Sequence, residues 1–282
     1  MRSAMMKGCL ACQSQNSKEL WLYSKHTVTQ CLECGFVWAP NAKGSKELYE
    51  SAYNDQQEGF TWNNFLKTHE SIKRGKPVNL HWYENDFLQN ITPFGDKRLL
   101  EIGCSTGRFL NVCQKAGWDI HGLDISEKAV QLTSELFPDA EIRCGTMENK
   151  YWGDNYFNVL ASWEVIEHVD NPFDFICLAN QLLSKNGILL LSTPDWGSWA
   201  IQRHPMKNYW PPYHIWFFNK KSITAILQRA GFRVIRIKRN LIPWSETCWP
   251  KWKRLIMLPF LIWKGIILRQ GGGRLVVYAQ KK

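Results

Sequence analysis

The sequence predicts an α/β protein with a doubly wound, mostly parallel sheet, preceded by a small metal-binding module. From about residue 96 onward, apolar runs of four to six residues alternate with amphipathic stretches of ten or more, the pattern of βαβ units. Two C-x-x-C pairs within the first 34 residues indicate the metal-binding module. The 282 residues, 45% of them apolar, suffice for one α/β domain and a small appendage.

Four cysteines define the amino-terminal module. Cys9 with Cys12, and Cys31 with Cys34, form two C-x-x-C pairs with eighteen residues between them. Four such sulfurs close a tetrahedral Zn²⁺ site with no open position, and the alternating residues between the pairs read as a strand. We therefore expect a zinc ribbon with structural Zn²⁺ over residues 1–44. A redox role would need only one pair beside a thioredoxin-like fold, and nine cysteines, an odd number, indicate reduced thiols.

A glycine loop and a later acid predict a site for an adenosyl nucleoside. Residues 99–110 read LLEIGCSTGRFL, in which Gly103 and Gly107 leave room where a cofactor would cross the backbone. Asp124 ends the next apolar run, where its carboxylate can accept both ribose hydroxyls. The spacing E-x-G-x-x-x-G differs from the G-x-G-x-x-G of dinucleotide binders, and Glu101 would repel a pyrophosphate but suit the ammonium of a methionine moiety.

The remaining elements continue the alternation. A connector at 45–95 is rich in aromatic and charged residues, with helical periodicity at 65–72 and 81–88. The residues at 184–187, Ser-Lys-Asn-Gly, predict a turn. We expect helices at 127–136, 173–183 and 221–230, and strands within 139–149, 156–172, 188–195, 232–238 and 274–279.

These motifs resemble the class I S-adenosylmethionine-dependent methyltransferases over roughly residues 96–231 and 274–279, and the segment EVIEHV at 164–169 resembles the ubiquinone-biosynthesis O-methyltransferases. The resemblance implies a seven-stranded Rossmann-like sheet over 96–282, S-adenosylmethionine as cofactor, and helices within 45–95 that cover the cofactor cleft. Ser105 stands where many members carry glycine. Thr146 stands where an acid or its amide usually holds the adenine amino group.

The expected cofactor residues combine the motif with the resemblance. Met147 follows the third strand, where family members flank adenine, and Trp163 ends the fourth strand, where it would border the sulfonium and the acceptor. We expect the cofactor to be bound by Glu101, Gly103, Cys104, Gly107, Asp124, Ile125, Met147 and Trp163.

Two histidines are candidates for the chemistry. Methyl transfer is an in-line displacement that needs positioning and, for a hydroxyl acceptor, a base, and histidine is the residue suited to that role near neutral pH. His214 lies in the aromatic-rich stretch 196–218, and His168 lies in EVIEHV, where Glu164 and Glu167 could orient it. Either histidine can also be an ordinary packed or exposed side chain.

The carboxyl-terminal third is strongly basic. Residues 201–282 contain seventeen Lys or Arg and one acid, Glu246, which favours a phospholipid surface, a phosphate-bearing substrate or nucleic acid as neighbour, or else a solvated basic face. An insertion at about 241–272 contains the apolar segment 255–268, whose fourteen residues are too few to span a bilayer. We expect either an interfacial helix giving peripheral membrane contact through 250–269, or a lid helix.

The predicted function is S-adenosylmethionine-dependent methylation of a small-molecule acceptor. O-methylation is favoured, with a sugar or polysaccharide precursor, or a lipid-linked or quinone-like molecule, as acceptor. We expect a cytoplasmic enzyme, with the inner membrane surface as a peripheral site, because MRSAMMKG contains no signal-peptide run. One alternative is a ribosomal RNA base methyltransferase, although the chain lacks N-P-P-Y and a cysteine-nucleophile loop. Another is a catalytically silent binding protein, to which Ser105 and Thr146 point.

Overall fold

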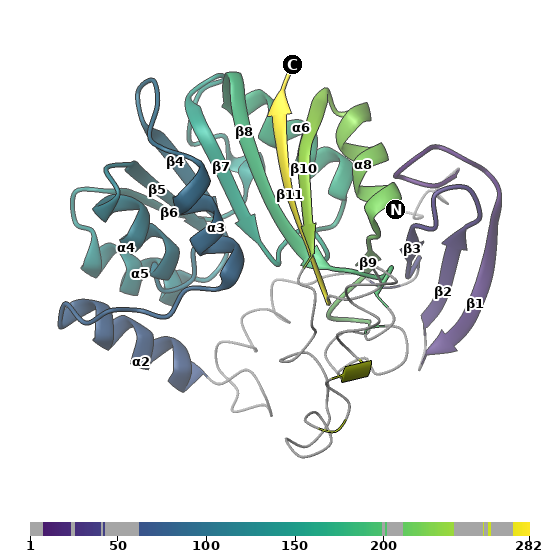
Figure 1. The fold of residues 1–282 in the computed structure, drawn as a ribbon, viewed down its shortest axis with the longest axis horizontal. Helices are drawn as coiled ribbons and strands as arrows, with labels where there is room; N and C mark the ends of the chain where they lie inside the picture. The colour runs from purple at the N-terminus through teal and green to yellow at the C-terminus, as the bar shows by residue number, and fades with distance from the viewer. Residues whose placement is uncertain are drawn as a thin grey trace. The chain divides into compact units, whose positions relative to one another are not determined.

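Two sheets organise the computed structural model (Figure 1). The structure describes residues 8–23, 26–40, 62–198, 211–239 and 273–282, together with the single residues 42, 201, 256, 259 and 260. Within them, one sheet has four strands in the order β1-β2-β3-β9, and the other has seven in the order β10-β11-β8-β7-β4-β5-β6. The predicted Rossmann-like, mostly parallel sheet of seven strands is confirmed.

The helices and strands have the following bounds. The four-stranded sheet contains β1 (Ser17–Tyr23), β2 (His26–Cys31), β3 (Val37–Trp38) and β9 (Trp216–Phe217). The seven-stranded sheet contains β4 (Arg98–Ile102), β5 (Asp119–Asp124), β6 (Glu141–Cys144), β7 (Phe157–Trp163), β8 (Leu183–Pro194), β10 (Phe232–Arg239) and β11 (Arg274–Lys281). The helices are α2 (Trp62–Lys73), α3 (Trp82–Asn90), α4 (Arg108–Lys115), α5 (Glu127–Leu136), the 3-10 turn η1 (Met147–Asn149), α6 (Pro172–Leu182) and α8 (Lys220–Arg229).

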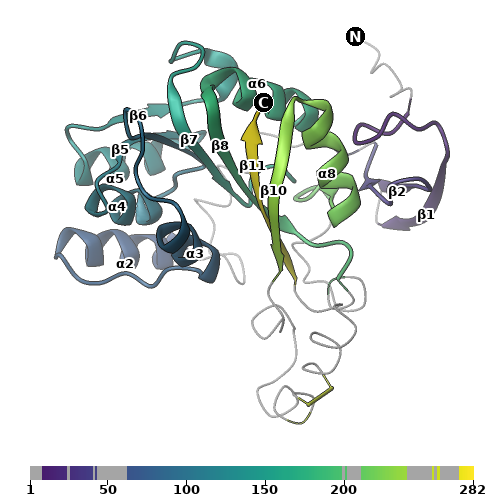
Figure 2. The same cartoon turned by 45° about the horizontal axis from the view of Figure 1, so that its top comes forward.

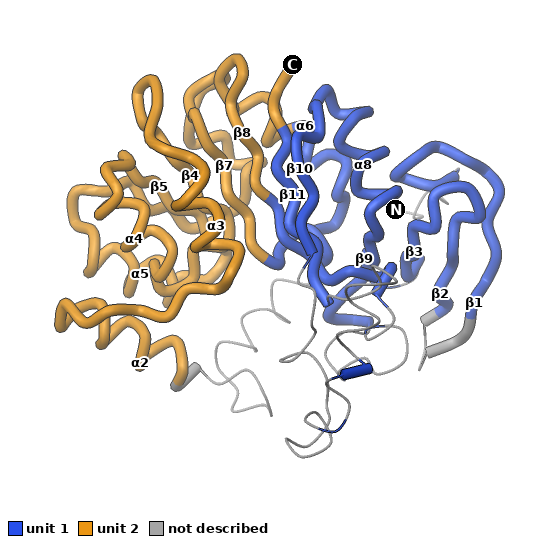
Figure 3. Tube along the Cα trace, in the orientation of Figure 1, with its two compact units in different colours: residues 1–44, 164–177, 191–279 blue, residues 45–163, 178–190, 280–282 orange. Residues whose placement is uncertain are grey.

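The chain forms two compact units (Figure 3). One comprises residues 1–44, 164–177 and 191–279 and is called the ribbon unit below. The other comprises residues 45–163, 178–190 and 280–282 and is called the glycine-loop unit. The expected division into domains 1–44, 45–95 and 96–282 stays a prediction, because the units reflect packing only.

The glycine-loop unit is built on parallel strands. Strand β4 pairs in parallel with both β5 and β7, and β5 pairs in parallel with β6. All seven residues of β7 are buried, as expected of a strand in the interior of a parallel sheet. Helices α4 and α5 pack against these strands, with α2 against both helices (Figures 1 and 2). The carboxyl ends of four parallel strands therefore come to one edge.

The ribbon unit continues the amino-terminal hairpin into the second half of the chain. Strands β1 and β2 pair antiparallel, β2 pairs with β3, and β3 pairs with β9 through Val37 opposite Phe217. Phe36 stacks on Trp216 with ring centroids 6.0 Å apart and an interplanar angle of 7°. The ribbon is thus joined to residues 180 positions further along the chain.

The predicted helices and strands agree with the structure within a few residues, with one exception. The turn expected at 184–187 is wrong, since β8 already begins at Leu183. Asn186 takes a left-handed φ of 63° and is exposed inside the strand, so a turn-like composition is accommodated without ending the strand. The insertion at 241–272 lies outside the described residues apart from residues 256, 259 and 260. Among the described helices, none has the length and apolarity to cross a membrane.

Candidate active site

The loop between β4 and α4 folds back onto the end of β5. Gly103 has a φ of 77° and donates its N–H to the carbonyl of Leu123 at 2.7 Å. Gly107 has a φ of 74° and begins α4 as its N-cap. A Cβ at Gly107 would lie 2.7 Å from the ring of Phe137, so the protein's own packing, besides any cofactor, requires glycine there.

Ser105 occupies the third left-handed position of this loop, with a φ of 49°. Its N–H donates to Oδ2 of Asp124 at 2.8 Å, and its carbonyl accepts the hydroxyl of Thr133 at 2.6 Å. These two hydrogen bonds hold a serine in a conformation that favours glycine. They explain how this chain tolerates the departure from the family pattern noted in the sequence.

Asp124 lies at the carboxyl end of β5 with 4% of its surface exposed. Its Oδ1 accepts the N–H of Ser126 at 2.9 Å, while Oδ2 accepts that of Ser105. Burial raises the pKa of this carboxyl, and the backbone amides oppose the rise. Each oxygen retains a further lone pair, so the carboxylate is fixed in place and still able to accept hydrogen bonds from a ligand.

Glu101 is buried at the end of β4, with 4% of its surface exposed, and its Oε2 has no hydrogen-bond partner. Burial raises the pKa of this carboxyl well above its ordinary value, and the nearby Glu84 adds to the rise, while Arg108 opposes it. Arg108 is held by Glu84, from Nη2 to Oε1 at 2.6 Å. A buried carboxyl oxygen without a partner is suited to receive a cationic group, such as the ammonium of the cofactor.

Aromatic side chains surround Trp163, the last residue of β7. Trp163 is 9% exposed, and its indole Nε1 is buried without a hydrogen-bond partner. The ring of Tyr83 lies 5.0 Å from the ring of Trp163, and that of Phe109 lies 5.3 Å from it in an edge-on arrangement. His81 stacks on Tyr83 at 5.0 Å. Electron-rich ring faces of this kind suit a sulfonium cation.

The structure brings the predicted cofactor residues together at the carboxyl ends of parallel strands. All eight belong to the glycine-loop unit. They lie in the last residues of a strand or in the loop after it: at β4 (Glu101, Gly103, Cys104 and Gly107), β5 (Asp124 and Ile125), β6 (Met147) and β7 (Trp163). Ligands of open α/β sheets bind at this edge. No sequence motif indicates the pairing of Glu84 with Arg108, because it depends on how α3 packs against α4.

A second cluster lies in the ribbon unit and contains Glu167, His168 and His214. Their ligand atoms all lie within 4.8 Å of one another. The rings of the two histidines have centroids 4.6 Å apart. Nδ1 of His168 donates to the carbonyl of Tyr213 at 2.6 Å, which leaves its Nε2 as the basic nitrogen, 3.9 Å from Oε1 of Glu167. The two predicted histidines are therefore brought together, with a buried acid beside them.

Burial shifts the pKa of each of these three groups in the direction that favours its uncharged form. Burial raises the pKa of Glu167 well above its ordinary value, and the charge of Glu164 adds to the rise. Burial lowers the pKa of His168 and lowers that of His214 further, aided by the charges of His168 and Arg274. Oε1 of Glu164 accepts the hydroxyl of Ser192 at 2.6 Å and lies 2.9 Å from Nε of Arg274. Neutral imidazoles beside an acid can accept a proton or bind a divalent cation.

The four predicted zinc ligands converge in the ribbon. Their sulfurs lie within 4.8 Å of one another, with Cys9 3.5 Å from Cys34 and Cys12 3.6 Å from Cys31. Four sulfurs about 2.3 Å from a central ion would be about 3.8 Å apart, which agrees with this spacing. The hydrogen bond with Cys34 lowers the pKa of Cys9, whereas the same bond raises the pKa of Cys34 and burial raises that of Cys12. The donor set fits Zn²⁺.

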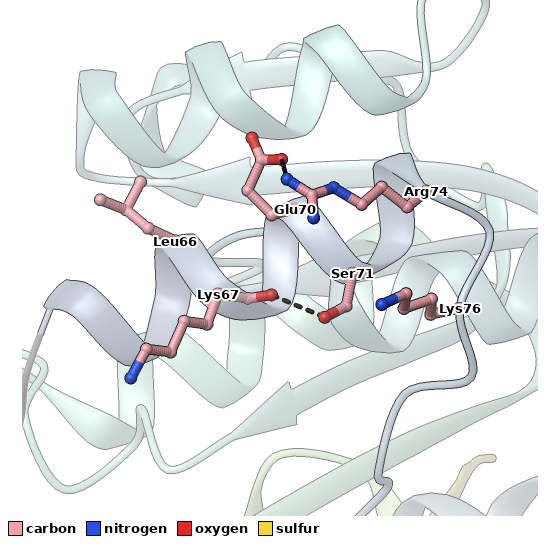
Figure 4. Close-up of a pocket in the computed structure, with 6 residues that line it drawn as sticks. All are labelled: Leu66, Lys67, Glu70, Ser71, Arg74 and Lys76. Atoms are coloured by element: carbon pink, nitrogen blue, oxygen red, sulfur yellow. Dashed lines mark hydrogen bonds and ion pairs between the residues drawn. The ribbon is translucent and has the colours of Figure 1, made fainter.

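A shallow pocket on α2 contains none of these residues (Figure 4). Glu70 and Arg74 form an ion pair across it at 3.2 Å, and the other lining residues are Leu66, Lys67, Ser71 and Lys76. Its charged side chains are at the surface, so it resembles a solvated helix face and not a binding site.

The fold and the glycine loop are those of α/β enzymes, whose ligands bind at the carboxyl edge of the sheet. A family model described as "Methyltransferase domain" matches residues 80–237, more than half of the chain. The chain belongs to the S-adenosylmethionine-dependent methyltransferases and is an enzyme of that family.

Relatives with curated names agree with this family. A ubiquinone biosynthesis O-methyltransferase of Roseobacter denitrificans is 30% identical over 175 residues, 56% of this chain and 70% of that protein. A protein of Mycolicibacterium smegmatis named "Probable S-adenosylmethionine-dependent methyltransferase" is 28% identical over 136 residues, 48% of this chain and 52% of that protein. The chain thus spans about half the length of the second relative.

Solved structures share the fold. An S-adenosylmethionine-dependent methyltransferase of Mesorhizobium loti aligns with a TM-score of 0.52 at 19% identity, covering 70% of this chain and 97% of that one. The cyclase SpnF aligns with a TM-score of 0.55 at 16% identity, covering 85% of this chain and 98% of that one. Proteins of this fold therefore carry out different chemistry, and the acceptor side must be argued from the residues.

Proposed function

We propose that this methyltransferase transfers the methyl group to a hydroxyl oxygen of a small-molecule acceptor, and that Glu167, His168 and His214 activate that oxygen. The single observation that carries the proposal is a fully buried acid, without a hydrogen-bond partner for either carboxylate oxygen, beside two imidazoles. Such a group is costly unless a ligand uses it. Relatives named ubiquinone biosynthesis O-methyltransferase support an oxygen acceptor of quinol type, with a sugar precursor as the other candidate.

The cofactor side uses residues of the glycine-loop unit. Asp124 accepts the ribose hydroxyls with the lone pairs that its amide partners leave. Glu101 binds the ammonium through Oε2, and Met147, 6% exposed at the start of η1, lies against adenine. Trp163 and Tyr83 face the sulfonium. When bound, S-adenosylmethionine supplies an electrophilic methyl group.

The acceptor side uses this cluster as a base. The imidazole of His214 would take the proton of the acceptor's hydroxyl group while that oxygen receives the methyl group that S-adenosylmethionine supplies. The hydrogen bond to the carbonyl of Tyr213 holds the ring of His168 in one tautomer beside Glu167, which can stabilise the imidazolium that forms.

The same three side chains offer a second means of activation. Two histidines and a carboxylate are a ligand set for divalent cations, and their ligand atoms lie within 4.8 Å of one another. A cation bound there would lower the pKa of the acceptor hydroxyl and remove the need for a separate base. This alternative concerns how the oxygen is activated and leaves the transfer itself unchanged.

Mass spectrometry of acceptors incubated with the enzyme and isotopically labelled methyl donor tests the proposal. Catechols, reduced quinones with short prenyl chains and nucleotide sugars form the panel, and we expect label on oxygen of one class. Label on carbon or nitrogen only, or on ribosomal RNA, would contradict it. Repeating the reaction with EDTA, and then with added Mg²⁺ or Mn²⁺ in protein that retains its Zn²⁺, separates the base from the cation, because rescue by Mg²⁺ or Mn²⁺ is expected only if a cation activates the acceptor.

Peripheral membrane contact through 250–269, an anionic or lipid-linked acceptor, and cytoplasmic location stay predictions. The segment 250–269 lies outside the described residues apart from residues 256, 259 and 260. Salt-sensitive sedimentation with anionic liposomes tests the contact.

A further inference from the structure

The zinc ribbon contacts the acceptor cluster through backbone hydrogen bonds within one compact unit. Strand β3 of the ribbon pairs with β9, which begins two residues after His214. Ile215 lies between the two: its carbonyl accepts the N–H of Ala39 at 3.0 Å, and its own N–H donates to the carbonyl of Glu167 at 3.0 Å. One residue therefore joins the end of the ribbon to the backbone of Glu167, the residue that supplies the acid of the cluster.

Side chains of α8 and of its N-cap residue donate hydrogen bonds to the backbone of both cysteine pairs. The amide Nδ2 of Asn219 donates to the carbonyl of Cys34 at 3.0 Å, and Lys221 donates to the carbonyl of Glu33. Arg229, at the other end of α8, donates to the carbonyls of Leu10 and Ala11 between Cys9 and Cys12. Helix α8 thus holds the backbone of each C-x-x-C turn.

The approach of the second turn to α8 is close. A Cβ on Gly35 would lie 2.8 Å from Nδ2 of Asn219, and Gly35 has a φ of 69°. Asn219 also caps α8, since its Oδ1 accepts the N–H groups of Lys221 at 2.8 Å and Ser222 at 3.0 Å. The two functions of this side chain use different atoms and can be separated by substitution.

We infer that Zn²⁺ in the ribbon positions the acceptor cluster, so that Ile215 and Asn219 are positioning residues for His214 and Glu167. The inference rests on the proposed role of that cluster. A ribbon of this size buries too little apolar surface to keep its shape unaided, and four thiolates on one ion fix its two turns. Losing the ion frees the backbone at Ala39 and Cys34, and with it the segment 213–219. The predicted cofactor residues all belong to the other unit. We therefore do not expect removal of zinc to change the affinity for S-adenosylmethionine.

The first experiment measures backbone hydrogen exchange with and without zinc. Zn²⁺ is removed from the full chain with 1,10-phenanthroline in the presence of Mg²⁺, and its content is followed by elemental analysis. We expect exchange at the amides of Ala39 and Ile215 to become at least tenfold faster, the dissociation constant for S-adenosylmethionine to change less than twofold, and added Zn²⁺ to restore protection. Unchanged exchange at Ile215 in zinc-free protein would overturn the inference.

A variant tests the link with zinc still bound. Asn219→Asp keeps the oxygen that caps α8 but replaces the donor to the carbonyl of Cys34 with a second acceptor. We expect full zinc content, at least fivefold faster exchange at Ala39 and Ile215, and a lower kcat for the acceptor. Asn186→Asp, which adds the same charge at an exposed position of β8, is the control and should change none of these.

The two proposals fail in different ways. If His214→Ala transfers methyl groups normally while zinc removal still exposes Ile215, the cluster's role fails and the structural link holds. If zinc removal abolishes binding of ribosomal RNA but leaves Ile215 protected, the ribbon is a nucleic-acid module, and the inference is overturned.

Discussion

The backbone N–H of Ser105 donates a 2.8 Å hydrogen bond to Oδ2 of Asp124, joining the glycine loop to the end of β5 at the centre of the predicted cofactor site. Because the donor is a backbone group, the bond depends on the left-handed conformation of residue 105 and not on its side chain. Substitutions at these two positions therefore have different expected effects, one on stability and one on cofactor affinity.

Ser105→Gly should stabilise the protein. A serine at a φ of 49° carries backbone strain of about 1–3 kcal/mol, and glycine relieves it at an entropic cost of about 0.5–1 kcal/mol. We expect the free energy of unfolding to rise by about 1 kcal/mol in urea titrations, with cofactor affinity unchanged. Ser126→Gly is the control, because Ser126 has an ordinary φ of −90° and caps α5. A Ser105→Gly protein less stable than wild type would show that the serine side chain itself is needed.

Asp124→Asn should weaken cofactor binding. The amide retains one acceptor oxygen, so it cannot receive both backbone N–H groups and the ribose hydroxyls. We expect a loss of about 2 kcal/mol, roughly thirtyfold in the dissociation constant, by calorimetric titration with S-adenosylmethionine. Asp119→Asn, at the opposite end of β5 with a 59% exposed side chain, should bind normally. Equal affinity in the two variants would remove Asp124 from the site.

His214→Ala should lower turnover and leave cofactor affinity within twofold. Loss of a general base reduces kcat by about 10²-fold or more. Single-turnover transfer to the identified acceptor, together with calorimetry, separates the two quantities. His69→Gln is a suitable control, because His69 lies on α2 and glutamine can replace its hydrogen bond to the carbonyl of Leu132. Normal turnover in the alanine variant would exclude His214 as the base.

Asp195→Asn should change how stability depends on pH. Burial raises the pKa of Asp195 to about 6 from an ordinary 3.8, although Arg239, 2.8 Å away, favours the ionised form. The folded state holds the proton more tightly than the unfolded state, so this stabilisation is complete below pH 3.8 and is lost as the pH rises through 6.

The wild type should therefore lose about 3 kcal/mol of unfolding free energy relative to Asp195→Asn between pH 3.8 and 7. Urea titrations of both proteins across this range provide the measurement. Asp170→Asn, at an exposed position, should follow the wild type. Parallel curves for wild type and Asp195→Asn would contradict the raised pKa.

Local patterns predicted most of the elements. Helix α5 begins and ends at the predicted residues 127 and 136, because Ser126 caps it and its apolar spacing is helical. The turn expected at 184–187 failed because its polar residues are exposed at the start of a strand, where burial places no constraint on them. Composition alone does not distinguish a turn from polar residues exposed at the start of a strand.

By itself, the sequence determined the chemistry that short spacings encode: four thiols for one ion, glycines at the first crossover, and an acid closing the second strand. Each C-x-x-C pair, and the glycine loop, consists of residues a few positions apart, whose geometry the backbone constrains directly. Tertiary structure alone decided that Ile215 lies between Ala39 and Glu167, and that Glu84 pairs with Arg108. Those contacts join residues far apart in the chain and arise only from packing, for which no local pattern exists.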